Sequence, residues 1–219
     1  MADVKEFYKK YKESNERQQE EENLLRMKII GDFVGTKKIV LDLGCYNGLQ
    51  LELLRKNRNS VMGIEISDEG ISECKRKNIF VVKHDITKKI PFKDKLFDVV
   101  VLGEVCEHLF NPSEVLKEIH RVLKDGGHLV LSTPNIAALT RRIKLLFGRN
   151  PNLDLWLENS SGHLRYYCYD SLKKLLIKNN FKVVGYESDF ILFNIFRFKR
   201  LVKLLKGFGW TIIINAEKA

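Results

Sequence analysis

Residues 38–48 read KIVLDLGCYNG, and this stretch decides the fold. The apolar run Ile39–Leu43 predicts a buried strand, and the glycine-rich turn after it opens a helix at Leu49. Proteins of the α/β class bind nucleotides at such turns, because a helix N-terminus offers unpaired N–H groups and glycines let the backbone approach a ligand. Asp42 lies at the end of this strand and Glu65 ends the next apolar run. Two acids at successive strand ends indicate a cationic or hydroxyl-rich ligand.

The alternation of strand and helix patterns continues along the chain. Strands are expected at residues 39–43, 60–66, 79–83, 96–102, 128–134, 181–186 and 210–215. Helices are expected at residues 4–33, 49–56, 68–77, 112–123 and 170–179, and basic amphipathic segments at residues 136–147 and 194–206. Strands that alternate with helices at this spacing predict βαβ units and a doubly wound, parallel α/β sheet.

Composition limits the class of protein. A chain of 219 residues with 44% hydrophobic and 30% charged residues is typical of a single globular domain. No apolar run approaches the roughly 20 residues that span a bilayer, and the N-terminus is too polar for a signal peptide, so a cytoplasmic protein is expected. The four cysteines lack C-x-x-C spacing, which argues against a zinc cluster. The net charge of +10 favours anionic partners or a membrane surface, unless it reflects a generally lysine-rich composition.

Five motifs in order resemble class I S-adenosylmethionine-dependent methyltransferases of the type 11 and 12 groups, including ubiquinone-biosynthesis O-methyltransferases and sugar or small-molecule methyltransferases. The motifs are VLDLGCYNG (40–48), GIEIS (63–67), KHDI (83–86), FDVVVLGEVCEHL (97–109) and LKDGGHLVLSTPN (123–135). Together they are far more specific than any one of them. The resemblance implies one domain over residues 1–219, built on a mostly parallel seven-stranded sheet whose last strand is antiparallel. It also implies S-adenosylmethionine as cofactor and S-adenosylhomocysteine as product.

The resemblance also assigns roles around the cofactor. Asp42 would help to hold its cationic end, and Glu65 would accept hydrogen bonds from both ribose hydroxyls. Ile66 would pack on the adenine, and Asp85 would accept a hydrogen bond from the exocyclic amine. The complete set of implied cofactor residues is Asp42, Gly44, Cys45, Tyr46, Gly48, Glu65, Ile66, Asp85, Ile86, Gly103 and Glu104.

Tyr46 departs from the family pattern, which usually has a second glycine at this position. A bulky residue does not easily take positive φ, so either the turn runs differently or the Tyr46 ring leans on the cofactor. A Rossmann dehydrogenase is a rival interpretation, since Glu65 fits both kinds of enzyme. However, Gly44 and Gly48 do not form G-x-G-x-x-G, and Asp42 would bring negative charge near a pyrophosphate.

The E-x-x-E-H pattern at residues 104–108 is the candidate catalytic segment. If it is helical, Glu104 faces Glu107 and His108. With His163, these residues resemble the divalent-metal site of some ubiquinone-pathway and small-RNA 2′-O-methyltransferases, which would suit Mg²⁺, Mn²⁺ or Zn²⁺. Alternatively, His108 and Glu107 act without metal, the histidine as a base or packed under the substrate.

The resemblance implies an acceptor side formed by an N-terminal helical cap (1–35) and an insert (136–169), and a basic amphipathic insert (190–209) precedes the last strand. The candidate walls of the acceptor side are Tyr8, Tyr11, Trp156, Tyr166, Tyr167 and Tyr169. Its basic residues are Arg141, Arg142, Lys144, Arg149, Arg197, Lys199, Arg200, Lys203 and Lys206. They indicate an anionic or lipid-linked acceptor, or docking at the inner face of the membrane, unless they merely form a solvated face.

The expected reaction is methyl transfer to a hydroxyl of a small-molecule, sugar or lipid-linked acceptor. The first alternative is an RNA 2′-O-methyltransferase, against which the chain shows no appended RNA-binding module and no basic residues interleaved with aromatics. The second is a non-catalytic cofactor-binding protein, for which Tyr46 is the motive.

Overall fold

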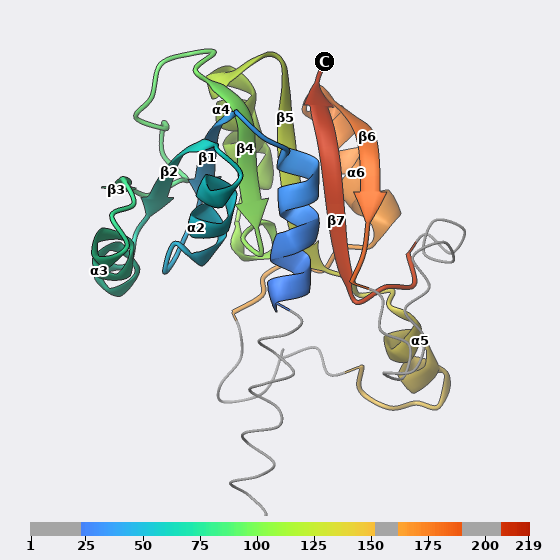
Figure 1. The fold of residues 1–219 in the computed structure, drawn as a ribbon. Helices are drawn as coiled ribbons and strands as arrows, with labels where there is room; N and C mark the ends of the chain where they lie inside the picture. The colour runs from blue at the N-terminus through green and yellow to red at the C-terminus, as the bar shows by residue number, and fades with distance from the viewer. Residues whose placement is uncertain (1–22, 152–161, 190–206) are drawn as a thin grey trace, which may run out of the picture.

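A twisted sheet forms the centre of the computed structural model, which describes residues 23–151, 162–189 and 207–219 (Figure 1). Its seven strands are ordered β3-β2-β1-β4-β5-β7-β6. The strands are β1 (Ile39–Leu43), β2 (Ser60–Glu65), β3 (Val81–Lys83), β4 (Phe97–Gly103), β5 (Leu123–Pro134), β6 (Phe181–Glu187) and β7 (Thr211–Lys218). Strands β1 to β5 pair in parallel, and β7 is antiparallel to both of its neighbours. The predicted fold class is therefore confirmed.

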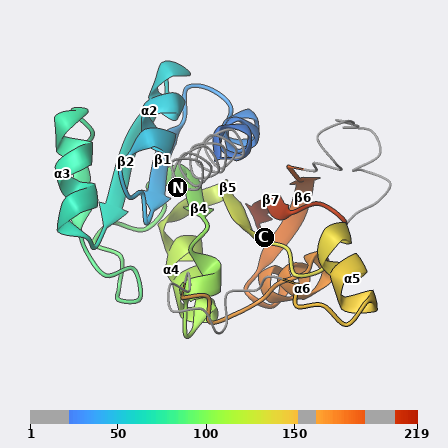
Figure 2. The same cartoon turned by 90° about the horizontal axis from the view of Figure 1, so that it is seen from below.

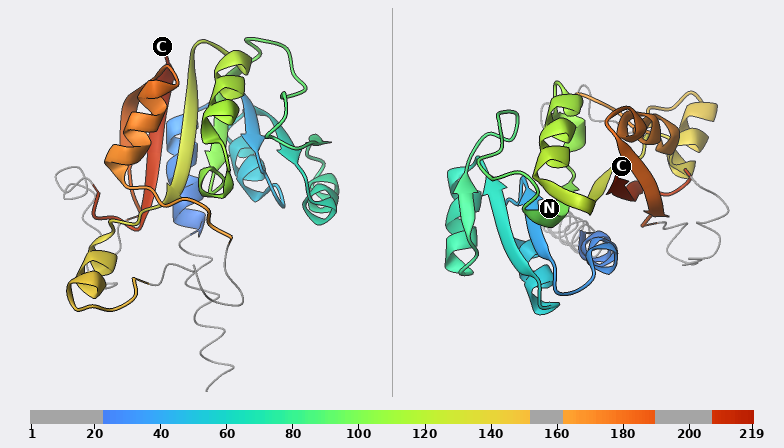
Figure 3. Two further views of the ribbon diagram at one scale, coloured as in Figure 1. Left: turned by 180° about the vertical axis from the view of Figure 1, so that it is seen from behind. Right: turned by 90° about the horizontal axis from the view of Figure 1, so that it is seen from above.

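Helices cover both faces of this sheet (Figures 2 and 3). They are a helix over residues 23–34, α2 (Leu49–Lys56), α3 (Asp68–Arg76), the 3₁₀ turn η1 (Cys106–His108), α4 (Pro112–Val122), α5 (Leu139–Leu146) and α6 (Tyr169–Lys178). The 23–34 helix and α2 pack on one face, while α4 and α6 contribute to the larger core on the other. Because both faces are covered, β1 and β4 are apolar almost throughout. No helix of the described residues is long and apolar enough to cross a membrane.

Local sequence explains where two of the helices begin. Ser67 is the N-cap of α3, and its hydroxyl accepts a hydrogen bond from Gly70 N at 3.2 Å. Pro112 occupies the first turn of α4, where its missing N–H costs nothing. Leu116 and Ile119 of α4 are fully buried against the sheet. Burial of each contributes about 2 kcal/mol to stability.

The structure differs from the predicted boundaries chiefly in strands β5 and β3. Strand β5 begins at Leu123, because Leu123 pairs with Phe97 and a bulge then carries the chain to the next pairing, Val99 with His128. Residues 125–127, which precede the strand predicted at residues 128–134, lie inside this irregular stretch. Strand β3 is limited to Val81–Lys83. The predicted segments at residues 4–22, 152–161 and 190–206 lie outside the described residues.

Candidate active site

A cavity of about 570 Å³ opens at the carboxyl ends of the central strands. Its walls come from the turn after β1, the end of β4 and the first turns of the 23–34 helix. Ligands of open α/β sheets bind at this edge, where the strand order reverses between β1 and β4. Six of the eleven predicted cofactor residues line the cavity: Asp42, Gly44, Cys45, Tyr46, Gly103 and Glu104.

Two glycines shape the turn between β1 and α2. Gly44 has φ 75° and Gly48 has φ 71°, values in the left-handed region that favours glycine. A Cβ on Gly44 would lie 2.8 Å from Val105 Cγ2, and one on Gly48 would lie 2.9 Å from Cys74 Sγ. The sequence therefore needs glycine at both positions to keep this turn close to its neighbours.

Tyr46 also takes positive φ, at 41°, so the expectation that a bulky residue avoids this conformation is wrong. The backbone is held there by its partners. Tyr46 N donates to Glu65 Oε2 at 2.8 Å, and Tyr46 O accepts from Cys74 Sγ at 3.3 Å. The charge-assisted bond to a buried carboxylate outweighs the left-handed strain of about 1–2 kcal/mol. The Tyr46 side chain remains 52% exposed beside the cavity.

Replacement of Tyr46 by glycine is expected to raise the free energy of unfolding by about 1 kcal/mol, because it relieves this strain. Urea unfolding measures the change. Arg58→Gly is the matched control, since Arg58 also has positive φ, at 61°. A loss of stability in Tyr46→Gly alongside a gain in Arg58→Gly would show that packing of the Tyr46 ring matters more than its backbone.

Glu65, at the end of β2, connects this strand by hydrogen bonds to the turn between β1 and α2. Its carboxylate is 7% exposed and accepts three backbone hydrogen bonds, each 2.8 Å long: from Tyr46 N to Oε2, and from Ile66 N and Ser67 N to Oε1. This side chain therefore fixes the shape of the turn from a strand 19 residues away.

The remaining predicted cofactor residues lie outside the cavity walls: Gly48, Glu65, Ile66, Asp85 and Ile86. Ile66 is 63% exposed and available to pack on a flat ring. Asp85 Oδ1 accepts from Thr87 N at 2.9 Å and from Thr87 Oγ1 at 2.7 Å, and these bonds lower the pKa of Asp85. Contact between Asp85 and an adenine stays a prediction.

Buried acids surround the cavity. Asp42 is 4% exposed, and burial, followed by repulsion from Glu65, raises its pKa to about 7. Burial also raises the pKa of Glu104, whose Oε1 accepts from Ser132 Oγ at 2.8 Å. A nearby positive charge favours the ionised form of a carboxyl, so Asp42 and Glu104 suit a cationic ligand.

Arg26 is the cavity residue that sequence reasoning missed. It projects from the 23–34 helix, with Nη1 3.6 Å from Glu104 Oε2, and its side chain is 19% exposed. The run LLRMKII at residues 24–30 contains two cations, Arg26 and Lys28, and nothing in the sequence distinguishes the cavity residue Arg26 from the exposed Lys28.

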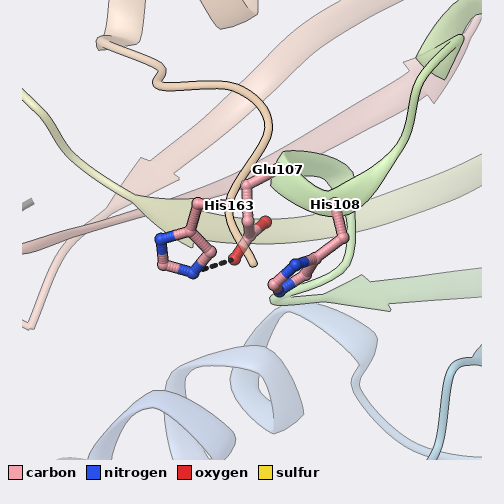
Figure 4. Close-up of side chains that lie close together, drawn as sticks. All are labelled: Glu107, His108 and His163. Carbon is pink, nitrogen blue, oxygen red and sulfur yellow. Dashed lines mark ion pairs between the residues drawn. The ribbon is translucent and has the colours of Figure 1, made fainter. Parts of the chain in front are cut away.

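Glu107, His108 and His163 converge beside this cavity (Figure 4). One ligand atom from each lies within 4.8 Å of the others. His163 Nε2 is 3.9 Å from Glu107 Oε1, and the rings of His108 and His163 are 4.9 Å apart. The Glu107 carbonyl accepts from Leu164 N and Arg165 N, which brings the 162–165 segment to η1.

The predicted helical arrangement of residues 104–108 is wrong. Glu104 has φ 54° and turns the chain after β4, and only Cys106–His108 forms a 3₁₀ turn. Glu104 is therefore directed to Ser132 and Arg26 and is not a member of the three-residue cluster.

Glu107, the acid of this cluster, is only 1% exposed. Its Oε2 accepts from Thr133 Oγ1 at 2.9 Å, while Oε1 has no hydrogen-bond partner among the described residues. Burial and then repulsion from Glu104 raise the pKa of Glu107 to about 7. The side chain is therefore balanced between its two protonation states near neutral pH.

Among the tyrosines predicted to form acceptor walls, the Tyr166 ring lies 6.2 Å from the His163 ring, whereas Tyr167 and Tyr169 pack within the protein. Tyr167 is 7% exposed, and its hydroxyl lies 3.5 Å from Cys106 Sγ. The Tyr169 ring packs edge-on against Tyr186 at 4.7 Å. Tyr8, Tyr11 and Trp156 lie outside the described residues.

Comparison with known proteins decides the family. A family model described as "Methyltransferase domain" matches residues 15–186. The chain belongs to this methyltransferase family. Among curated relatives, an uncharacterized protein of Methanocaldococcus jannaschii is 27% identical over 83% of this chain and 77% of its own length. A ubiquinone biosynthesis O-methyltransferase of Nitrosomonas europaea is 30% identical over 52% of each chain, so the match spans about half of that enzyme.

Solved structures agree on the fold of the methyltransferase. An S-adenosylmethionine-dependent methyltransferase of Thermotoga maritima, described as a possible histamine N-methyltransferase, superposes with a TM-score of 0.68. The two are 20% identical over 90% of this chain and 88% of that one. A methyltransferase of Archaeoglobus fulgidus gives a TM-score of 0.64 at 21% identity, over 90% of this chain and 94% of that one. The family match, together with the names of the curated relatives, makes the protein an S-adenosylmethionine-dependent methyltransferase.

The residues of the methyltransferase cavity fit that cofactor. Its sulfonium and amino groups are cationic, and the cavity contains the carboxyls of Asp42 and Glu104. Asp42 receives no hydrogen bond among the described residues, and Gln50 Oε1 in the cavity wall is buried without a partner there. Such groups are stabilised by a polar ligand.

Proposed function

We propose that this methyltransferase acts on a hydroxyl group of a small-molecule, sugar or lipid-linked acceptor. The observation that carries the proposal is Glu107, a buried carboxyl whose Oε1 lacks a hydrogen-bond partner among the described residues and lies between two imidazoles. A hydroxyl must lose its proton during methylation, and Glu107, with a pKa of about 7, is matched to accept one at neutral pH.

The cofactor, when bound, supplies an electrophilic methyl group on a positively charged sulfur. Gly44 and Gly48 would let the turn approach its methionine part, and Asp42 would pair with its positive charge. Arg26, in the cavity wall, would pair with its carboxylate, a role for which a guanidinium is well suited. Glu65 would accept hydrogen bonds from its ribose hydroxyls. Because the cofactor already carries the reactive charge, the protein contributes chiefly by positioning the acceptor.

In this proposal the cluster with His108 and His163 forms the acceptor end of the site. The His108 ring nitrogen Nδ1 lies 3.2 Å from Gly162 O, and this contact joins η1 to the segment of the 136–169 insert that follows residue 161. In the proposed arrangement, the insert brings His163 to Glu107 and completes the acceptor side. The two imidazoles then orient the hydroxyl while Glu107 accepts its proton.

A divalent metal is the second explanation of the same cluster. One carboxylate oxygen and two imidazole nitrogens are a donor set that Mn²⁺ or Zn²⁺ accepts, and a metal would acidify a hydroxyl. If activity survives a chelator, Glu107 accepts the proton of the acceptor hydroxyl. If activity is lost to the chelator and restored by Mn²⁺ or Zn²⁺, a metal acidifies that hydroxyl.

Calorimetry with S-adenosylmethionine, followed by methyl transfer from labelled cofactor to panels of hydroxyl and amine acceptors, tests the proposed function. We expect cofactor binding and transfer to hydroxyl acceptors. Transfer only to amines would refute the hydroxyl proposal, and the absence of cofactor binding would favour a non-catalytic protein.

Cofactor affinity is expected to rise with pH up to about 7, because binding a cation favours the ionised form of Asp42. The pKa of Asp42 is raised to about 7 in the free protein, so binding below this pH releases a proton. Affinity then falls by up to about tenfold for each pH unit below 7. Calorimetry at pH 5.5, 6.5 and 7.5 measures the slope. Asp42→Asn should bind more weakly at pH 7.5 and show a flatter pH dependence.

The raised pKa of Asp42 also predicts how the stability of the folded protein depends on pH. Because the protonated Asp42 is favoured in the folded state, its contribution to stability is present below the unfolded pKa of about 4 and is lost as the pH rises through 7. Asp42→Asn should therefore gain stability relative to the parent as the pH rises. An equally steep pH dependence of cofactor affinity in Asp42→Asn would contradict the assignment.

A further inference from the structure

Helix α5 presents an apolar face that the described part of the protein does not cover. Leu139, Ile143, Leu146 and Phe147 recur at the spacing of one helix face. None of the residues of α5 is buried, and Leu146 and Phe147 are 79% and 72% exposed. A surface helix of a globular protein ordinarily turns this stripe toward the core. Here the stripe is exposed among the described residues.

The charges around this face have one sign. Arg141, Arg142, Lys144 and Arg149 flank the apolar residues, and residues 136–151 contain no Asp or Glu. A helix with leucine, isoleucine and phenylalanine on one side, and with cations but no acids around them, matches the interface between water and an anionic lipid surface. A protein groove of mixed charge would be matched less well by such a face.

The helix is held firmly on the body of the protein. Leu139 N donates to Phe208 O at 2.9 Å, and Arg142 Nε donates to Ala137 O at 2.6 Å. The Arg142 guanidinium lies over the Phe208 ring at 4.6 Å, and that of Arg141 lies 5.9 Å from the Trp210 ring. These contacts involve the first residues of α5. The apolar face of the helix is exposed among the described residues and can insert into a lipid surface.

The position of α5 relates it to the active site. It projects from the sheet at the end where the parallel strands terminate, the same end at which the cavity opens (Figures 1 and 3). A surface that contacts α5 therefore lies on the acceptor side of the molecule. Delivery of a lipid-linked acceptor from that surface rests on the proposed function, whereas docking itself does not.

We propose that α5 docks this methyltransferase on anionic phospholipid membranes. Ile143, Leu146 and Phe147 enter the boundary between headgroups and acyl chains. Lys144 and Arg149 contact the lipid phosphates. Each cation near such a surface strengthens binding by about fivefold, and the buried apolar side chains add to it.

Flotation of the full chain with vesicles tests the proposal without any measurement of methyl transfer. One set of vesicles contains phosphatidylcholine with about 30% phosphatidylglycerol, an anionic lipid, and the other contains phosphatidylcholine alone. We expect binding to the anionic vesicles that weakens with salt. Leu146→Ser/Phe147→Ser should reduce this binding by more than about tenfold, and Lys144→Gln/Arg149→Gln by about 25-fold.

The matched control is Ile177→Ser/Lys178→Gln on α6, which removes an exposed apolar residue and an exposed cation from another helix. It should bind as the parent does, and circular dichroism checks that every variant folds. No binding at low salt, equal binding to neutral vesicles, or equal loss in the α6 control would overturn the proposal. So would a dimer that only Leu146→Ser/Phe147→Ser dissociates, with vesicle binding unchanged.

Discussion

Replacement of Glu65 by glutamine is expected to lower the affinity for S-adenosylmethionine by about a hundredfold or more. The substitution removes the charged acceptor of two proposed hydrogen bonds from the ribose hydroxyls. Hydrogen bonds to charged groups contribute about 1.5–3 kcal/mol each. The same substitution also disturbs the turn. If the amide oxygen keeps Ile66 N and Ser67 N, its NH₂ group faces Tyr46 N–H, so two donors oppose each other.

The turn should therefore loosen even without cofactor. Because Tyr46 has positive φ, it relies on this bond to stay in the left-handed region. We expect the free energy of unfolding to fall by about 2–4 kcal/mol, which corresponds to one or two lost charge-assisted bonds. Calorimetry and urea unfolding measure the two effects.

Glu69→Gln is the matched control for Glu65→Gln, since Glu69 is an exposed acid in the first turn of the neighbouring helix α3. It should change neither quantity by much. Unchanged cofactor affinity in Glu65→Gln would remove Glu65 from the cofactor site. Weak affinity that Tyr46→Gly restores in the double variant would show that Glu65 acts only through the turn.

The parts of the fold that sequence predicted well are those decided by local pattern. Strand β1 and helix α2 have the expected boundaries, Ile39–Leu43 and Leu49–Lys56, because a doubly covered strand must be apolar and a glycine turn must follow it. The resemblance carried by the five motifs also predicted the mostly parallel, seven-stranded sheet with an antiparallel last strand.

The site depends on contacts that local pattern does not contain. Tyr46 adopts positive φ because Glu65, on another strand, holds its N–H. Glu104 separates from Glu107 because the backbone turns left-handed after β4, which the helical spacing of E-x-x-E-H did not anticipate. Conversely, His163 meets Glu107 although 56 positions separate them, a pairing that only the family resemblance suggested.

Replacement of Glu107 by glutamine is expected to lower kcat by about 10²–10⁴-fold, the usual contribution of a general base. The amide oxygen can still accept from Thr133 Oγ1, so the fold keeps its contact while the proton acceptor is lost. KM for the cofactor should change little, because Glu107 does not line the cofactor cavity. In the parent, kcat should rise with pH up to about 7 and then level off. Steady-state kinetics measures both.

Stability separates a catalytic role for Glu107 from a merely structural one. Its pKa is raised from about 4.5 to about 7, so the folded state favours the protonated form. The contribution of Glu107 to stability is therefore present below 4.5 and is lost as the pH rises through 7. Glutamine has no charge to bury, so the melting temperature of Glu107→Gln should improve relative to the parent between pH 5 and pH 8.

A variant that loses activity while gaining relative stability is the signature of a functional buried charge, since a structural residue would lose both. Glu114→Gln, at an exposed position on α4, should change neither kcat nor this pH trend. If Glu107→Gln keeps full activity, the general-base role is wrong. If its activity falls and a chelator abolishes that of the parent, Glu107 acts as a metal ligand, and the proton leaves a metal-bound hydroxyl instead.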